Sequence, residues 1–238
     1  MIHILTTSYN CEQYIERCLA SITSQKNKNF KCYVTDDMST DNSVIKIKNF
    51  IKGDDRFVLI ENSVKMYQPG NYDQVIRGEY GIDDNDIMVE MDGDDWFPDR
   101  NVLTRVESVY SDSDVWVANG KFKYSDGRPG FANPPNNIGN IRNETFTASH
   151  LRTWRAFIWR KIKVNDLKDK NGVYWEVAGD LSFMYPMIEM SGLKHYRFMD
   201  DINYIYNESN PLNDHKVKMS SVNEVVNIIR NMPKYNLL

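Results

Sequence analysis

Residues 87–100 read IMVEMDGDDWFPDR, a short apolar run that ends in a cluster of carboxylates. Residues 87–91 have the length and composition of a buried strand, and Asp92, Asp94 and Asp95 follow at once. Like charges this close repel one another, so we expect a positive group among them. One residue separates Asp92 from Asp94, and in extended backbone this spacing points both side chains to the same side. Two convergent carboxylates form a hard oxygen site suited to Mg²⁺ or Mn²⁺, and Gly93 lets a ligand approach the backbone closely.

Two other interpretations of this stretch can be weighed from the sequence. A calcium site of the helix–loop–helix kind would need an acidic or amide residue at position 96 and glycine at 97. Trp96 and Phe97 stand there, so that interpretation is excluded. A solvated acidic turn is an alternative for the motif alone, but the other polar clusters described below argue against it.

The chain before this stretch alternates between strand and helix patterns. Apolar runs typical of strands lie at 2–5, 30–37 and 57–60. Apolar residues at helical spacing lie between them, at 15–22, 44–51 and, more weakly, 72–80. Such alternation predicts a doubly wound, mostly parallel α/β sheet.

The second half of the chain is less regular. Residues 125–143 are rich in Gly, Pro and Asn, which predicts a loop or a turn-rich excursion. The further elements that we expect are a strand at 199–206 and helices at 149–162, at 179–190 with an interruption at Pro186, and at 222–229. The predicted helix at 149–162 has a basic face made of Arg152, Arg155, Arg160 and Lys161. We expect all these elements to pack as a single domain over residues 1–238.

The composition is that of a globular protein, with 41% hydrophobic and 26% charged residues among 238. A formal net charge of −4 gives no general reason to expect nucleic acid or an anionic membrane as a partner. No apolar run reaches the length of roughly 18 residues that a transmembrane segment needs, and the N-terminus lacks the pattern of a signal peptide. Cys11, Cys18 and Cys32 lack metal-ligand spacing, so we expect reduced thiols in the core. These features predict a soluble cytoplasmic or other intracellular protein, or a domain of a longer one, and they leave a homodimer open.

Polar clusters follow three of the predicted strands. They are Thr7-Ser8-Tyr9-Asn10, Asp36-Asp37 and Asp92-Gly93-Asp94-Asp95. Because ligands bind outside the carboxyl ends of the strands in an open parallel sheet, we expect these clusters to meet at one crevice. In a ligand site, a carboxylate of the Asp36-Asp37 pair would accept the imide N–H of a uracil ring, and Tyr9 would supply a stacking face. Taken alone, the pair is better suited to capping a helix, and Tyr9 to a place in the core.

Three segments resemble the family-two glycosyltransferases of the GT-A fold: ILTTSYNCEQYIERCLASITSQ (4–25), FKCYVTDDMSTDNS (30–43) and IMVEMDGDDWFPD (87–99). The resemblance implies a mixed, mostly parallel sheet flanked by helices. A Rossmann-like nucleotide-binding half would lie at 1–110, and an acceptor-binding half with the catalytic base and a C-terminal helix at 111–238. It also implies a metal-dependent, inverting transfer of a sugar from a nucleotide-diphosphate sugar, usually a UDP-sugar, to a hydroxyl of a glycan, protein or lipid-linked acceptor.

The resemblance assigns roles by position. Nucleotide binding would fall to Thr7, Tyr9, Asp37, Asn71 and Asp92. Asp94 and Asp92 would hold Mn²⁺ or Mg²⁺, with Asp95 as a close neighbour. His215 matches loosely a histidine that helps bind metal or diphosphate in the family, and Lys216 and Lys218 could pair with phosphate. A solvated loop is the alternative for this last segment.

The catalytic base of the family lies at a helix start in the second half. Gly179-Asp180 matches this place, which implies that Asp180 deprotonates the acceptor hydroxyl. Glu176 is the substitute, and an N-cap is the alternative role for Asp180. His150 and Arg152 are candidates for contact with the acceptor or the diphosphate, although His150 suits a structural role equally well.

The chain departs from the family in one place. Family members commonly carry an Arg-Asn pair at the start of the third helix, where this sequence has Gly70 and Asn71. Lys65 and Arg77 are the candidates to supply the missing charge.

Two other functions compete with sugar transfer. A sugar nucleotidyltransferase would carry a Gly-rich, basic phosphate loop after the first strand, and TTSYNCEQY has neither feature. A catalytically inactive module that binds nucleotide sugars is the second alternative. The joint presence of Asp92, Asp94 and Asp180 argues against it.

Overall fold

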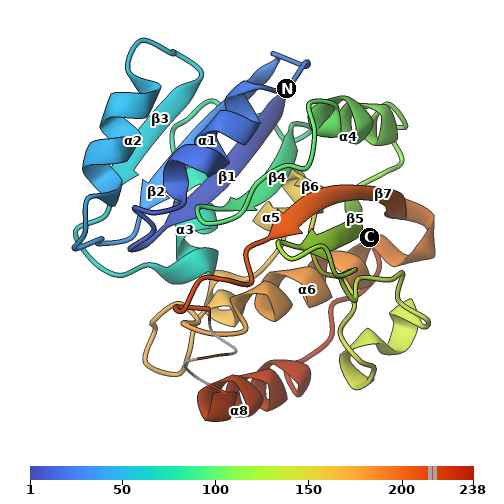
Figure 1. Ribbon diagram of the computed structural model, residues 1–238. Helices are drawn as coiled ribbons and strands as arrows, with labels where there is room; N and C mark the ends of the chain where they lie inside the picture. The colour runs from blue at the N-terminus through green and yellow to red at the C-terminus, as the bar shows by residue number, and fades with distance from the viewer. Residues whose placement is uncertain (214–215, 217–218) are drawn as a thin grey trace.

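The computed structural model describes residues 1–213, 216 and 219–238, and its centre is a seven-stranded sheet (Figure 1). The strands are β1 (Ile2–Ser8), β2 (Phe30–Asp36), β3 (Phe57–Glu61), β4 (Ile87–Asp92), β5 (Val117–Tyr124), β6 (Arg152–Arg155) and β7 (Tyr196–Tyr206). They lie in the order β3-β2-β1-β4-β6-β5-β7.

The first four strands form one parallel block. β1 pairs in parallel with β2 on one side and with β4 on the other, and β2 pairs in parallel with β3. Helices cover both faces of this block, which is why its strands are nearly continuous apolar runs. The register places Thr7 opposite Asp92 and Ser8 opposite Asp36, so the polar strand ends lie along one edge of the sheet.

The second half of the chain extends this block into a mixed sheet. β6 is antiparallel to both β4 and β5, and β7 is parallel to β5. The expected mixed, mostly parallel sheet flanked by helices is therefore confirmed.

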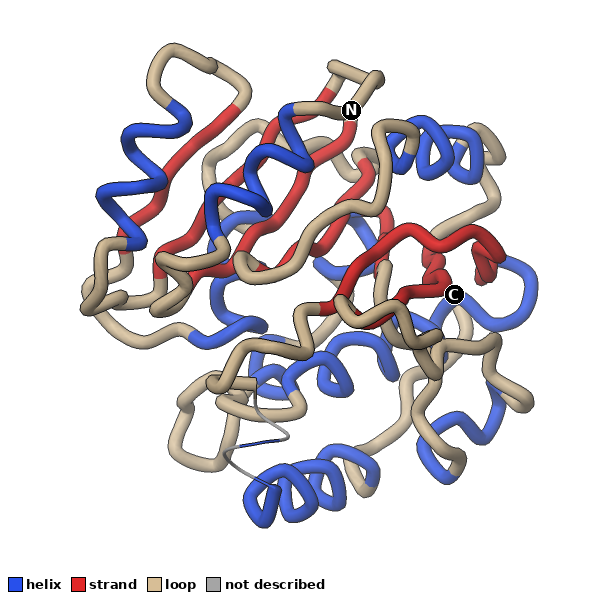
Figure 2. Tube along the Cα trace, viewed as in Figure 1, coloured by secondary structure: helices blue, strands red, loops and turns tan. Residues whose placement is uncertain are grey.

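Helices form a layer on each face of the sheet (Figures 1 and 2). α1 (Ile15–Thr23), α2 (Ser43–Ile51) and α4 (Val102–Tyr110) pack their apolar residues into the core on one face. α3 (Tyr67–Ile76), α5 (Ala156–Arg160) and α6 (Gly179–His195) pack on the other face, and α8 (Met219–Arg230) lies outside α6. Two short 3₁₀ turns, η1 (Ile138–Asn143) and η2 (Val164–Leu167), complete the second half.

Most elements predicted from the sequence are present, with some changes in their bounds. The helix expected at 72–80 begins at Tyr67 and ends at Ile76. Its early start has a physical reason: the Asp37 carboxylate accepts the N–H groups of Met66 and Tyr67 and anchors the first turn. α6 continues past Pro186 to His195, and its dihedral break comes at Gly192 instead. β5 and α4 were not predicted.

The helix predicted at 149–162 is wrong in its first half. Residues Arg152–Arg155 form β6, a central strand with all its residues buried, and only Ala156–Arg160 are helical. Leu151 packs in the core on one face of the sheet and Trp154 in the core on the other, so the two do not share a helix face. The predicted basic face is wrong as well, because Arg152 and Arg155 are buried.

Cys11, Cys18 and Cys32 are free and buried, as the sequence predicts. Within the described part of the chain, no helix combines the length and the apolar character needed to cross a membrane.

Candidate active site

A cavity of about 850 Å³ lies at the carboxyl ends of the parallel strands. The expected site residues that line it are Thr7, Tyr9, Asp37, Asn71, Asp92, Asp94, Asp95, His150, Arg152, Glu176 and Asp180. His215 and Lys218 lie outside the described residues, and Lys216 is exposed and donates to the carbonyl of Asn210 at 3.2 Å. The three polar strand ends therefore meet in one cavity, together with residues from the second half.

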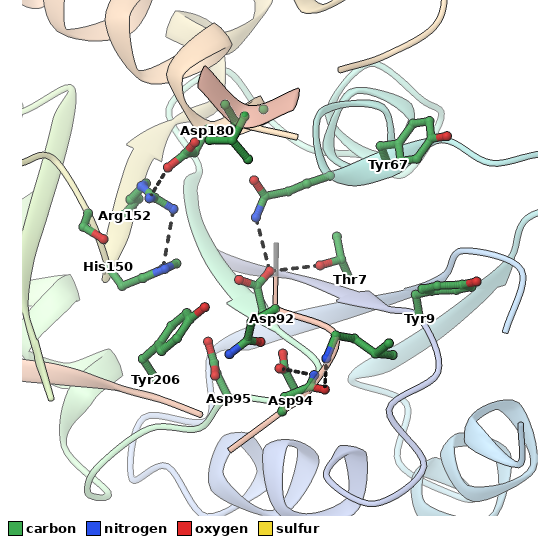
Figure 3. Close-up of a pocket in the computed structure, with 18 of the residues that line it drawn as sticks. Thr7, Tyr9, Tyr67, Asp92, Asp94, Asp95, His150, Arg152, Asp180 and Tyr206 are labelled. Carbon is green, nitrogen blue, oxygen red and sulfur yellow. Dashed lines mark hydrogen bonds and ion pairs between the residues drawn. The ribbon is translucent and has the colours of Figure 1, made fainter. Parts of the chain in front are cut away.

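Figure 3 shows how the cavity is arranged around Asp92. Tyr9 and Tyr67 lie on one side of this carboxylate, and His150 and Tyr206 lie on the other. Asp180 lies apart from the Asp94–Asp95 pair, with Arg152 beside it. A ligand that passed over Asp92 would thus have aromatic rings at both of its ends.

Each carboxylate of the cluster has its own hydrogen-bond partners. Asp92 Oδ1 accepts the Thr7 hydroxyl at 3.0 Å and the Gln68 amide at 3.2 Å. Asp94 Oδ2 accepts the side-chain amide of Asn210 at 2.6 Å. The turn itself is tight, because the Gly93 N–H donates to the Thr7 carbonyl at 2.8 Å and a Cβ at position 93 would lie 2.8 Å from the same oxygen. A glycine is therefore required where β4 ends beside β1.

Asp95 is tied to the chain that follows β7. Its Oδ1 accepts the N–H of Asn207 at 2.6 Å, its Oδ2 is buried, and the Tyr204 side chain also interacts with the carboxylate. A carboxylate buried this deeply beside other carboxylates is costly to ionise unless something positive approaches it.

The electrostatics of the cluster favour a cation. Burial and the nearby Asp92 carboxylate raise the pKa of Asp94 to about 6. Burial also raises the pKa of Asp92, and burial together with Asp94 and Asp92 raises the pKa of Asp95 well above its ordinary value. Carboxylates with raised pKa values, crowded into one buried turn, form a donor set that fits a divalent ion.

The end of the cavity near β2 holds Tyr9 and Asp37. The Tyr9 ring is 47% exposed, and Lys65 Nζ lies 2.9 Å from its centroid. Asp37 is buried and accepts three hydrogen bonds, from Asn62, Met66 and Tyr67, at 2.8 to 2.9 Å. Lys65 Nζ lies 3.7 Å from its Oδ2. Asp37 thus anchors the start of α3, while its carboxylate faces the cavity.

The missing Arg of the family pattern has a steric explanation. A Cβ at Gly70 would lie 2.6 Å from the ring of Tyr174, so no larger side chain fits there. Arg77 does not replace it, because its guanidinium pairs with Asp73 at 2.6 Å and donates to the backbone carbonyl of Ile162, just after α5, at 2.7 Å. Lys65 is the cation that lies at this end of the cavity.

Asp180 is the second residue of α6. The residue before the helix is Ala178, in the left-handed region at φ 51°, and no side chain caps the helix. Asp180 Oδ1 accepts the N–H of Leu181 at 3.0 Å, and its Oδ2 accepts Arg152 Nη2 at 2.5 Å. Asp180 is therefore an ion-paired carboxylate at the cavity wall and does not occupy the N-cap position.

Arg152 connects Asp180 to a buried carboxylate, Glu90, that no sequence motif indicated. Arg152 Nη1 lies 2.9 Å from both oxygens of Glu90, and its Nε donates to the Ala148 carbonyl at 3.0 Å. His150 Nδ1 lies 2.7 Å from Glu90 as well, and its ring stacks on Tyr204 at 4.4 Å. Burial opposes the charge on Glu90, but Arg152 and His150 outweigh it and lower the pKa of Glu90. The sequence signal was a lone acidic residue inside the apolar run IMVEM.

The far end of the cavity has an aromatic wall that was also not predicted. It is made of Phe122, Tyr124, Phe131 and Tyr206, whose rings pack edge to face or tilted at 5.3 to 6.2 Å. Phe131 is 52% exposed, and Arg128 lies 4.7 Å over the Tyr124 ring. These residues come from β5, β7 and the loop after β5, where periodicity gave no strong signal.

A model of the family described as Glycosyl transferase family 2 matches residues 3–175. The chain belongs to glycosyl transferase family 2.

Two curated relatives of this family 2 chain are bacterial. The putative glycosyltransferase EpsH of Bacillus subtilis (strain 168) is 21% identical over 231 residues, which cover 93% of this chain and 62% of EpsH. The glycosyltransferase GlyA of Streptococcus pneumoniae is 29% identical over 121 residues, or 50% of this chain and 16% of GlyA. The chain thus spans less than two thirds of the length of these relatives.

Solved structures share the fold of this family 2 chain. S. aureus TarS 1–349 in complex with UDP-GlcNAc matches with a TM-score of 0.69 and 18% identity, over 96% of this chain and 65% of that one. Glucosyl-3-phosphoglycerate synthase from Mycobacterium tuberculosis, with Mn²⁺, UDP and phosphoglyceric acid, matches with a TM-score of 0.64 and 13% identity, over 98% and 80%. These matches confirm the GT-A fold.

Proposed function

We propose that this chain transfers a sugar from a UDP-linked donor to an acceptor hydroxyl, with inversion at the anomeric carbon and with a divalent metal. Membership of glycosyl transferase family 2 supports sugar transfer as the class of reaction. The donor and the metal are suggested by fold relatives, since TarS was solved with UDP-GlcNAc and the mycobacterial synthase with Mn²⁺ and UDP. The observation that carries the proposal is a single cavity that holds Asp180 together with Asp92 and Asp94.

Asp92 and Asp94 are the residues that would hold the cation. Their carboxylate oxygens are the ligands that Mg²⁺ and Mn²⁺ prefer, and their raised pKa values are those of a site that a cation would complete. In the described part of the chain, no group of three or more His, Cys, Asp and Glu side chains is arranged to hold a metal. Donor phosphates and water would therefore supply the remaining ligands, and a bound cation would offset the charge of the departing diphosphate.

The other end of the donor would lie near β2. Tyr9 offers an exposed ring face for the base once Lys65 moves aside, and Lys65 then remains close enough to face the diphosphate. Asp37 Oδ2 accepts the Tyr67 N–H, and a carboxylate oxygen with two lone pairs could also accept the imide N–H of uracil. Thr7 acts indirectly in this proposal, because its hydroxyl holds Asp92 in place.

Asp180 would act as the general base. An inverting transfer needs a carboxylate that removes the proton of the attacking hydroxyl, and Arg152 holds Asp180 at the cavity wall. Tyr206 lies across Asp92 from Tyr9, and Phe122 and Tyr124 of the aromatic wall pack against it, so we assign the acceptor to that side. Aromatic rings of this kind can stack on the apolar face of a sugar ring.

A thermal-shift screen of nucleotide sugars with and without Mn²⁺ tests the donor directly. We expect a UDP-sugar to raise the unfolding temperature, and we expect the rise to require the metal, because a ligand that binds the folded state stabilises it. Hydrolysis of the same donor, with water in place of the acceptor, then measures turnover.

The variant Asp94→Asn tests the metal assignment. We expect it to abolish the metal-dependent part of the thermal shift and to reduce hydrolysis at least a hundredfold, because the metal loses an anionic ligand. The exposed carboxylate Asp55 supplies the matched control, and Asp55→Asn should leave both measurements unchanged. If Asp94→Asn behaved like this control, the assignment of the metal would be wrong.

A further inference from the structure

Arg152 is shared between two carboxylates, and this sharing is what sets Asp180 apart from the other acidic residues of the cavity. One side of the guanidinium faces both oxygens of Glu90 at 2.9 Å, and the other faces Asp180 at 2.5 Å. Figure 3 shows Arg152 between His150 and Asp180. The side chain of Arg152 is 3% exposed and that of Glu90 is 1% exposed, whereas that of Asp180 is 23% exposed. Of these three ion-paired side chains, Asp180, the proposed base, is therefore the one that solvent or a substrate can reach.

An arginine beside a general base has two opposing effects. It fixes the carboxylate in one orientation, which favours proton transfer from a positioned hydroxyl. It also favours the ionised form of that carboxylate and so weakens it as a base. A second carboxylate on the same guanidinium offsets part of the positive charge while it keeps the guanidinium in place. Glu90 is the residue in that position, and its burial makes the compensation strong.

We infer that Glu90 is a positioning residue for the general base: through Arg152 it holds the Asp180 carboxylate and offsets the charge that would otherwise weaken it. The inference rests on the proposed role of Asp180 and adds a residue outside the substrate contacts. β4 would then contribute to both the base and the donor site. Glu90 supports Asp180 through Arg152, and Asp92, two residues later, lines the cavity where the donor would bind.

The structure offers an activity-independent reporter for Asp180. The Leu181 N–H donates to Asp180 Oδ1 at 3.0 Å, so its amide resonance in a ¹⁵N-labelled protein follows the protonation of that carboxylate during a pH titration. Arg152 and Tyr185 interact with Asp180 directly. Asp92, His150, Glu176 and Tyr67 line the same cavity, and Glu90 acts on Asp180 through Arg152. Glu90 and Arg152 are the ones changed in the test.

A matched control lies elsewhere on α6. Glu189 is also buried and pairs with an arginine, Arg142, at 2.6 and 2.9 Å, and it lies nine residues further along α6 than Asp180. Glu90→Gln and Glu189→Gln therefore remove the same charge from the same kind of buried pair. A merely structural role would make the two variants alike.

We expect the midpoint of the Leu181 titration to fall by about one pH unit in Glu90→Gln, because Arg152 then acts on Asp180 alone. Glu189→Gln should leave the midpoint within about 0.2 units of the wild type, since remote charges are largely screened. In donor hydrolysis, Glu90→Gln should lower kcat about tenfold while KM for the donor and the affinity for UDP stay unchanged. An unchanged midpoint in Glu90→Gln, or equal shifts in both variants, would overturn the inference.

The double variant Glu90→Gln/Arg152→Met provides a second test if the single variant misfolds. It removes both charges of the buried pair, so no charged group is left buried without its partner. It takes the nearest positive charge from Asp180, so the midpoint should rise above that of the wild type. A midpoint equal to that of the wild type would also overturn the inference. The titration needs no donor and remains readable if wild-type protein turns over no nucleotide sugar, so failure of the proposed function and failure of this inference can be told apart.

Discussion

At the scale of the residue, the site depends on a few charged groups whose surroundings differ sharply. Asp94 and Asp180 are both carboxylates in one cavity, yet Asp94 is crowded by Asp92 and Asp180 is paired with Arg152. The first environment favours a cation and the second favours an oriented anion. The two residues are of the same type, so it is their surroundings that suit Asp94 to metal binding and Asp180 to proton transfer.

The cysteines give a test of burial at the same scale. Burial raises the pKa of Cys11 and of Cys32 to about 12 and that of Cys18 well above its ordinary value. A raised pKa means that the reactive thiolate is scarce below that pH, so at pH 8 about one thiol in ten thousand is ionised. We expect no reaction with a thiol reagent at pH 8 in the native state and reaction of all three thiols in denaturant, measured by absorbance. Rapid labelling of the native protein would contradict the packing described here.

Some of the site residues could be predicted from the sequence, and others could not. Asp92, Asp94, Asp37 and Tyr9 follow strands that are easily recognised, so their convergence could be predicted from the rule that strand ends share an edge. Glu90 could not be assigned a partner, because Arg152 is 62 residues away and comes beside it only through the pairing of β4 with β6.

At the scale of the element, the contact between α3 and α6 sets the position of Asp180, the proposed base. A Cβ at Gly179 would lie 2.7 Å from the ring of Pro69, and one at Gly70 would lie 2.6 Å from Tyr174. Gly179 therefore allows α3 and the start of α6 to approach closely, and Gly70 allows α3 to approach the segment that precedes α6. These close approaches explain why this chain lacks a large side chain at both places.

The variant Gly179→Ala tests this contact. We expect it to lower the free energy of unfolding by about 1–3 kcal/mol through overpacking and to reduce turnover, because Asp180 is the next residue and must shift. Gly139→Ala is the control, since its Cβ would lie 3.3 Å from a side-chain oxygen of Asn137 that can rotate away. Urea unfolding and donor hydrolysis give the two readouts. Equal behaviour of both variants would show that the contact is not important.

The elements also show why β6 was mistaken for a helix. Leu151, Trp154, Phe157 and Ile158 have helical spacing, and Trp154 and Ile158 are both fully buried. A short strand that runs directly into a helix produces the same spacing, so periodicity could not separate the two. By contrast, β1, β2 and β4 are buried on both faces and read as apolar runs with turn residues behind them, which is a strong signal.

At the scale of the whole molecule, a buried ion pair joins the last part of the chain to the rest. Arg142 in η1 pairs with Glu189 of α6 and donates to the carbonyls of Ile229 and Met232 at 2.7 and 3.3 Å. The cavity is partly lined by Val222 and Val226 of α8, so this pair supports one of its walls.

We expect Arg142→Met to lower the free energy of unfolding by about 3–5 kcal/mol, because it leaves the Glu189 carboxylate buried without its partner. Arg197 pairs with Asp112 at 3.4 Å near the surface, and Arg197→Met should cost less than about 1 kcal/mol. Denaturant unfolding of the two variants compares these values directly. A small effect at Arg142 would mean that the C-terminal part is held by apolar contacts instead.

We propose above all that Asp180 removes the proton from the group that attacks a UDP-sugar bound in this cavity. The most direct measurement is the rate of metal-dependent donor turnover by Asp180→Asn beside the affinity of the same variant for UDP and Mn²⁺. We predict that turnover falls by a factor of about 10²–10⁴, the usual share of a general base, while the affinity is kept within about twofold. Turnover equal to that of the wild type, with affinity intact, would show that Asp180 is not the general base.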